Sequence, residues 1–167
     1  TPQAGGDPPA EIGTEAVVTS LMASARAAAP AATILVLDDE PSIRLLLSRI
    51  LRSAGHRPLM AADGPEALAL VRRGDVQAVL CDHRMAGMSG IDVFEAVVAL
   101  RPDLATRFVF MSGDVLNAEL REFAHDRGIG LLAKPFDVEA AVGAIDNLLR
   151  GEPIGGPVVP ADAGTVV

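Results

Sequence analysis

The clearest indication of how this chain folds is TILVLDDEPSIRLLLSRILRSAG, residues 33–55. Its first six residues are a short, mainly aliphatic run that is typical of a buried strand. From Pro41 to Ala54 apolar residues recur every three or four positions, which indicates an amphipathic helix, and Gly55 is suited to end it. The stretch therefore predicts one strand followed by one helix.

The same pattern recurs four more times along the chain. Strand-like runs precede helical segments at 57–62 and 66–73, 76–82 and 91–100, 107–112 and 115–127, and 129–133 and 138–149. Alternation of this kind predicts an α/β fold in which helices cover both faces of a parallel sheet and the crossovers are right-handed. Five units are too few for an eight-fold barrel.

The segments outside these units differ in composition. Residues 1–13 and 151–167 are rich in Gly, Pro and Ala, and we interpret 1–32 as a linker and 151–167 as a tail. Residues 14–29 could form a short helix. One folded domain over 33–150 is therefore expected. Because the chain begins at Thr1 without a signal sequence, we interpret it as a fragment of a longer protein.

Composition and charge argue against several classes of function. The 167 residues carry a formal net charge of -8, with a pI near 4.8, which argues against a broad contact with nucleic acid. Apolar residues make up 50% and aromatic residues 3%, so an aliphatic core is expected. The sequence has no candidate membrane span, and its single cysteine, Cys81, cannot form an internal disulfide. We expect a cytoplasmic protein without membrane contact.

Polar residues stand where the predicted strands end. Asp38 and Asp39 follow the first strand, Asp82 ends the third, Ser112 ends the fourth, and Lys134, the only lysine in the chain, follows the fifth. In open parallel sheets, sites form beyond the carboxyl ends of the strands, near the point where strand order reverses. If the order is 2-1-3-4-5, the three carboxylates share a small volume. Oxygen ligands of this kind suit Mg²⁺ and leave room for a phosphoryl oxygen.

Four motifs, in this order, resemble those of the receiver domain of two-component response regulators. They are LVLDDEPS at 35–42, CDHRMAGMSG at 81–90, MSGD at 111–114 and LLAKPF at 131–136. The resemblance covers about residues 33–150 and implies a flavodoxin-like (βα)5 doubly wound sheet with strand order 2-1-3-4-5. It also implies a switch rather than an enzyme, with at most weak self-dephosphorylation.

The resemblance assigns a role to each polar residue in phosphoryl transfer. Asp82 would accept a phosphoryl group from a histidine kinase or a histidine phosphotransfer domain. Lys134 would hold that group, and Ser112 would donate a hydrogen bond to it. The Lys134–Pro135 peptide bond is expected to be cis.

The resemblance also implies a metal site. Asp39, Asp82 and the backbone carbonyl of Arg84 would bind Mg²⁺ directly, and Asp38 would act mainly through water. These carboxylates are the same ones that the strand ends bring together in the predicted sheet.

Several alternatives remain open from the sequence. A pseudo-receiver would bind partners without phosphorylation, and a Mg²⁺ phosphatase would use an aspartyl nucleophile, although Arg84 stands where such enzymes commonly have a second acid. The context could be a stand-alone regulator or the C-terminal receiver of a hybrid sensor histidine kinase. Residues 109–124 resemble hybrid receivers, which favours the second context.

Three positions carry more specific expectations. Leu131 stands where many receiver domains have a Tyr or Phe whose rotamer follows phosphorylation, so the readout would depend on Ser112, the loop after it and aliphatic repacking. We hypothesise that Arg84 and Asp114 pair across the site and shield the phosphoryl group from water. A homodimer through the fourth and fifth helices of the domain is a further expectation.

Overall fold

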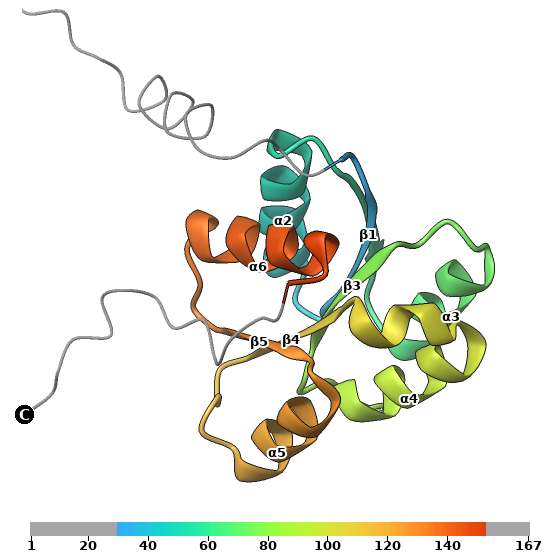
Figure 1. Ribbon diagram of the computed structural model, residues 1–167, viewed down its shortest axis with the longest axis vertical. Coiled ribbons are helices and arrows are strands. Elements are labelled where there is room, and N and C mark those ends of the chain that lie inside the picture. The colour runs from blue at the N-terminus through green and yellow to red at the C-terminus, as the bar shows by residue number, and fades with distance from the viewer. Residues whose placement is uncertain (1–29, 153–167) are drawn as a thin grey trace, which may run out of the picture.

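The computed structural model describes residues 30–152, in which five parallel strands form one sheet in the order β2-β1-β3-β4-β5 (Figure 1). The predicted fold class and strand order are therefore confirmed. The possible helix at 14–29 and the tail after 152 lie outside the described residues. The elements are β1 (Thr33–Leu37), α2 (Pro41–Ser53), β2 (Arg57–Ala61), α3 (Gly64–Arg72), β3 (Ala78–Asp82), α4 (Gly90–Leu100), the 3-10 helix η1 (Pro102–Thr106), β4 (Phe108–Ser112), α5 (Ala118–Arg127), β5 (Gly130–Ala133) and α6 (Val138–Arg150).

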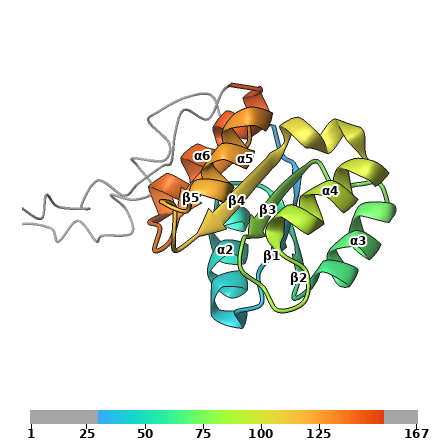
Figure 2. The same cartoon turned by 90° about the horizontal axis from the view of Figure 1, so that it is seen from below.

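Helices cover both faces of the sheet, as Figures 1 and 2 show. Alternate strand residues point to opposite faces, so Leu35 and Leu37 of β1 pack with α3, α4 and α5. Ile34 and Val36 pack with α2 and α6 on the other face. Because both faces are covered, β1, β3, β4 and β5 are almost wholly buried, which explains their continuous apolar sequences.

Side chains at the helix starts set where most helices begin. Asp63, Ser89, Asn117 and Asp137 each accept a hydrogen bond from a backbone N–H in the first turn of α3, α4, α5 and α6. The Asn117 cap places the start of α5 three residues later than the predicted position 115. The short helix η1 was not predicted; it connects α4 to β4.

The strand register brings the polar strand ends to one edge of the sheet. Leu37 lies beside Cys81 in the β1 and β3 pair, and Ser112 lies beside Ala133 in the β4 and β5 pair. The residues that follow these strands therefore meet, although they are far apart in sequence. Among the helices that the structure describes, none is long and apolar enough to cross a membrane.

Candidate functional site

The site is centred on an ammonium group between two carboxylates. The Nζ atom of Lys134 is 2.7 Å from Oδ2 of Asp38 and 3.3 Å from Oδ1 of Asp82. Asp38 is fully buried, whereas the side chains of Asp82 and Lys134 are 9% and 17% exposed. The contact between Lys134 and Asp38 joins residues 96 positions apart in the chain. The side chains singled out at three strand ends therefore do converge.

Burial and neighbouring charges shift the pKa values of Asp82 and Lys134. Burial raises the pKa of Asp82, and the negative charge of Asp38 adds to this; the ammonium of Lys134 and the Arg84 backbone N–H oppose the rise without cancelling it. Burial alone would lower the pKa of Lys134, but its hydrogen bond to Asp38 and the charge of Asp82 raise it overall. Lys134 is therefore held as an ammonium, whereas ionised Asp82 carries a cost that a further positive charge would relieve.

Asp38 is held from several sides. Its Oδ1 atom accepts a hydrogen bond of 2.9 Å from the Glu40 backbone N–H, while Oδ2 accepts from Lys134. Its carbonyl oxygen accepts one of 2.7 Å from the Arg44 guanidinium on α2. Arg44 is half-buried because it binds the end of β1, whereas Arg49 and Arg52 on the same helix are exposed.

A cation fits the donors at this edge. Asp38, Asp39 and Asp82 each offer a carboxylate oxygen, and these three oxygens lie within 4.8 Å of one another. Three carboxylates gather here with one ammonium, so the group keeps a net negative charge. Hard oxygen donors with uncompensated charge are the ligands that Mg²⁺ prefers. Asp39 is exposed, which gives a hydrated ion access to the site.

Ser112 connects this edge to the start of α5. Its hydroxyl, 2% exposed as a residue, accepts a hydrogen bond of 3.0 Å from the Asp114 backbone N–H. The Asp114 carbonyl accepts one of 3.3 Å from the Asn117 N–H, and the Asn117 side chain accepts one of 2.9 Å from the N–H of Leu120 in α5. A continuous series of hydrogen bonds therefore connects Ser112 to the N-terminal cap of α5.

The predicted pair between Arg84 and Asp114 is present. Arg84 Nη2 lies 3.4 Å from Asp114 Oδ2, and the two side chains are 71% and 48% exposed. The pair joins the loop after β3 to the loop after β4, on either side of the site. The Lys134–Pro135 peptide bond is cis, as expected, and Cys81 is buried; burial raises the pKa of its thiol well above the usual value. The Arg84 carbonyl as a metal ligand stays a prediction.

His83 was not singled out as functional, and its place depends on the packing of α4. A Cβ atom on Gly90, at the start of α4, would lie 2.8 Å from the carbonyl oxygen of Asp82 and 2.9 Å from Cα of His83. The helix thus begins directly against the end of β3, which only glycine permits. The imidazole of His83 turns inward, and its Nδ1 atom is buried. The close spacing of Asp82 and Gly90 in the sequence was the available indication that α4 begins near the end of β3.

The chain resembles known proteins over most of its described residues. Residues 34–146 match the response regulator receiver domain family. The sensor kinase CckA of Brucella abortus (strain 2308) is 31% identical over 71% of this chain, which corresponds to 13% of that protein. The sporulation initiation phosphotransferase F of Bacillus subtilis (strain 168) is 29% identical over 70% of this chain and 92% of its own length.

A solved structure shows the same fold. The chemotaxis protein CheY4 of Vibrio cholerae superposes with a TM-score of 0.65 at 28% identity, covering 71% of this chain and 98% of its own. The chain therefore spans a small part of the sensor kinase but nearly the whole length of the phosphotransferase and of CheY4. With the family match, the strand order and the acidic edge in agreement, this chain belongs to the receiver domain family of two-component response regulators.

Proposed function

We propose that this chain is a phosphoacceptor switch in which Asp82 takes a phosphoryl group from a histidine of a kinase or of a histidine phosphotransfer domain. The observation that carries the proposal is the position of the Lys134 ammonium, which contacts Asp82 and Asp38 while Asp39 lies beside them. A switch that worked without phosphorylation would not need to bury this cluster of charges. We assign no enzymatic turnover to the domain beyond weak self-dephosphorylation.

Asp82 is the nucleophile in the proposed reaction. A carboxylate oxygen attacks phosphorus, the bond between phosphorus and the donor histidine nitrogen breaks, and the histidine leaves as imidazole. The product is an acyl phosphate on Asp82. Burial raises the pKa of Asp82, but the charge of Lys134 opposes that rise and favours the carboxylate form, so the proposed attack needs no side chain to remove a proton. The main requirement is therefore positioning and charge compensation.

Lys134 and Ser112 would act on the phosphoryl group once it is attached. The Lys134 ammonium already lies 3.3 Å from Asp82 and would neutralise charge on the transferred oxygens. The Ser112 hydroxyl accepts its bond from Asp114 and still has a proton to donate to a phosphoryl oxygen. Turning Ser112 toward that oxygen would pull on the hydrogen-bonded loop that leads to α5, which provides a route to a conformational response.

The metal ligands in this proposal are Asp39, Asp82 and the Arg84 carbonyl, with Asp38 acting through water. The engagement of both Asp38 oxygens, by Glu40 and by Lys134, supports the indirect role. Bound Mg²⁺ would supply positive charge that offsets the carboxylates and the phosphoryl oxygens. The raised pKa of Asp82 supports the need for such a charge.

The face of α2 next to the site suits the phosphodonor. Leu45 and Leu46 are 55% and 41% exposed, and the exposed Arg49 and Arg52 lie on the same helix, which has no acidic residue. We assign this surface to a helix that carries the donor histidine together with apolar and acidic side chains. The relation to the sensor kinase supports a hybrid kinase as the context, and the near full-length match to the phosphotransferase supports a stand-alone regulator.

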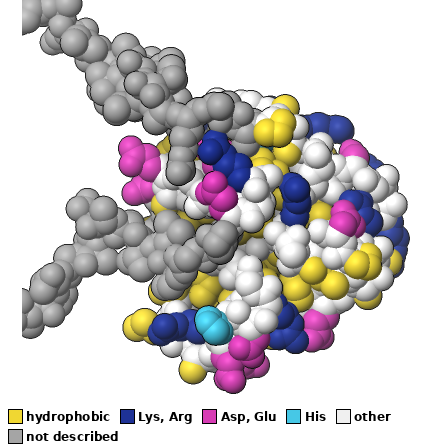
Figure 3. All heavy atoms as spheres, viewed as in Figure 1, with side chains coloured by type: hydrophobic (Ala, Val, Ile, Leu, Met, Phe, Trp, Pro, Cys, Tyr) yellow, Lys and Arg dark blue, Asp and Glu magenta, His cyan; other side chains and the backbone are white. Residues whose placement is uncertain are grey.

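The other partner assignments follow from charge and surface. With a net charge of -8 we assign no nucleic-acid contact, and with a kinase that uses ATP as its phosphate source we assign a cytoplasmic location. Acidic, basic and histidine side chains mingle over α5 (Figure 3), and the exposed members are Glu119, Arg121, Glu122, His125, Asp126 and Arg127. A homodimer through α5 and α6 would use this surface, and sedimentation with and without acetyl phosphate tests it.

Mass spectrometry tests the proposed function. The protein is incubated with acetyl phosphate and Mg²⁺, and we expect an adduct of about 80 Da that is absent in Asp82→Asn. Asp75→Asn, which changes an exposed carboxylate elsewhere, is the matched control and should keep the adduct. An intact protein that forms no adduct and consumes no acetyl phosphate would be a pseudo-receiver. Rapid consumption without an adduct would indicate a phosphatase.

A further inference from the structure

The aromatic side chains form an unexpected cluster. Of the five phenylalanines in the chain, Phe94, Phe108, Phe110 and Phe123 contact one another on one face of the sheet. Their ring centroids are 5.1 to 6.2 Å apart, which is the range of favourable ring pairs. The fifth, Phe136, packs on the opposite face with α2 and α6. Nearly all ring contacts of this mainly aliphatic chain therefore lie between β4, α4 and α5.

One end of the cluster reaches the site. The imidazole of His83, the residue after Asp82, lies edge-on to Phe110 with centroids 6.3 Å apart. Its Nδ1 atom is buried and has no hydrogen-bond partner within residues 30–152. Buried polar atoms without a partner are unfavourable and rare in native proteins. The imidazole is thus the one aromatic group beside the phosphoacceptor whose present position leaves a polar atom unsatisfied in the described part of the chain.

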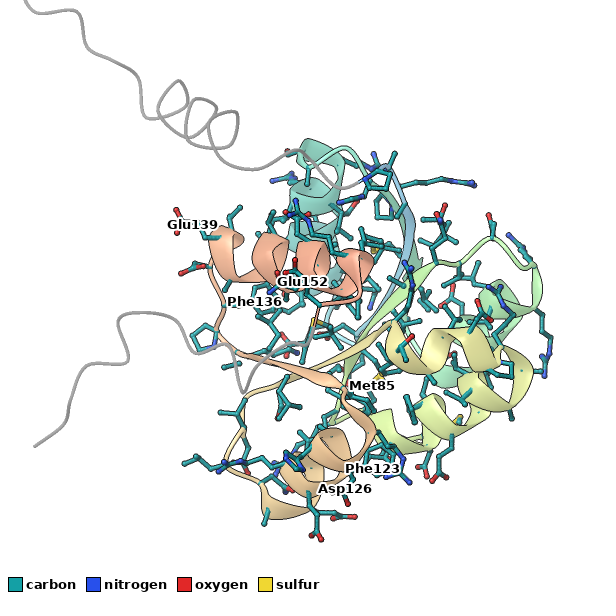
Figure 4. The ribbon with its side chains drawn as sticks, viewed as in Figure 1. Met85, Phe123, Asp126, Phe136, Glu139 and Glu152 are labelled. Atoms are coloured by element: carbon teal, nitrogen blue, oxygen red, sulfur yellow. The ribbon has the colours of Figure 1, made fainter. Side chains whose placement is uncertain are left out.

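The other end of the cluster reaches the surface of α5. Phe123 contacts Phe94 and Phe110, and the Arg127 guanidinium stacks over its ring at 3.8 Å from the centroid. Figure 4 shows Phe123 on the side of α5 that faces α4. Only Leu120 and Ala124 of α5 are buried, so Phe123 is a large part of what holds this helix to the domain. A displacement of these rings therefore acts on α5.

We propose that His83 couples the chemical state of Asp82 to the position of α5 through Phe110 and Phe123. The inference rests on the proposed phosphorylation of Asp82. This coupling takes the place of the aromatic readout that the chain lacks because Leu131 stands at the usual Tyr or Phe position. Leu131 is itself buried against the phenylalanine cluster. A change at the end of β3 that turns the imidazole moves the edge of Phe110, then Phe123, and with it Arg127 on the outer face of α5.

Fluorine NMR tests this coupling in the whole chain. The phenylalanines are replaced by 4-fluorophenylalanine, and the five signals are assigned with Phe→Leu variants. After acetyl phosphate and Mg²⁺ are added, we expect both the Phe136 signal, two residues from Lys134, and the Phe123 signal to shift. In His83→Leu the adduct and the Phe136 shift should persist, while the Phe123 shift should fall by at least half.

The outcomes separate the coupling from the proposed function. An adduct with no Phe123 shift in the parent protein, or an undiminished shift in His83→Leu, overturns the coupling. If no adduct forms, the proposed function fails, and the coupling is then judged by Asp82→Asn, which removes the charge beside His83. The Phe123 signal must move in that variant, and an unchanged signal overturns the coupling. Five dispersed signals in His83→Leu and in Asp82→Asn show that these two variants have folded.

Discussion

Replacing Lys134 by methionine removes the ammonium group from between Asp38 and Asp82 while keeping a side chain of similar length. The ammonium lies 2.7 Å and 3.3 Å from the two carboxylates, so its gross attraction to them is about 6 and about 5 kcal/mol at an effective dielectric constant of about 20. Much of this offsets the cost of burying the three groups. The informative quantity is what the variant leaves behind, which is two buried carboxylates without a counter-charge.

The expected loss follows from two bounds. Breaking a buried ion pair by removing one partner typically costs about 3 to 5 kcal/mol. A carboxyl group can instead take up a proton, which limits the cost of its charge to about 4 kcal/mol at pH 7. We therefore expect the free energy of unfolding of Lys134→Met to fall by about 3 to 4 kcal/mol in EDTA. For a domain of this size the Tm should fall by roughly 10 to 15 °C.

Urea unfolding followed by far-ultraviolet circular dichroism measures this loss, since the chain has no Trp or Tyr for a fluorescence assay. Saturating Mg²⁺ should restore more stability to Lys134→Met than to the parent, because the ion replaces the missing positive charge. Arg57→Met is the matched control: its pair with Asp75 is exposed, and the loss should stay below about 1 kcal/mol. If Lys134→Met loses no more than this control in EDTA, the reasoning about the buried charges is refuted.

Four further predictions concern other positions. In EDTA at pH 7, Asp82→Asn should be more stable than the parent, and the difference should close as pH falls, because an acid with a raised pKa loses stability as pH rises through that pKa; a constant difference from pH 7 to 3 would contradict this. Arg84→Ala should speed loss of the phosphoryl group by about twofold to fivefold in a mass-spectrometric time course. An unchanged half-life would contradict the hypothesis that the Arg84–Asp114 pair shields this group from water. Gly90→Ala should cost about 1 to 3 kcal/mol in urea unfolding, because its Cβ meets backbone, whereas Gly143→Ala, with open space in α6, should be neutral or stabilising; equal effects would show that the start of α4 can shift freely. Burial lowers the pKa of His56, so stability should fall as pH drops from about 7 to 5, and His56→Gln should lose less over this range by thermal unfolding; identical slopes would argue against it.

The fold could be predicted because its signals are local and repeated. Five buried strand sequences alternate with five amphipathic helices between residues 33 and 150, and chirality leaves few ways to connect such units. The same alternation places a polar residue after each of four strands, and parallel strands present those ends at one edge. The sequence was therefore sufficient to predict the convergence of Asp38, Asp82, Ser112 and Lys134.

Helix starts and side-chain partners were harder to predict from the sequence. The start of α5 depends on Asn117 accepting a hydrogen bond from Leu120, which competes with a start at residue 115 that periodicity also allows. Arg44 belongs to a helix with a basic exposed face, yet it binds the Asp38 carbonyl because the end of β1 lies within its reach. Composition and periodicity do not distinguish such an arginine from its solvated neighbours.

Hydrophobic spacing and chain direction are enough to predict the alternating strands and helices, the covered parallel sheet and the set of residues at the strand ends. The folded structure was needed to show that Lys134 contacts Asp38 more closely than Asp82, and that His83 turns inward against Phe110. Such contacts depend on strand register and on how closely α4 packs against β3. Those distances are set by packing across the whole domain, between residues as far apart as 38 and 134.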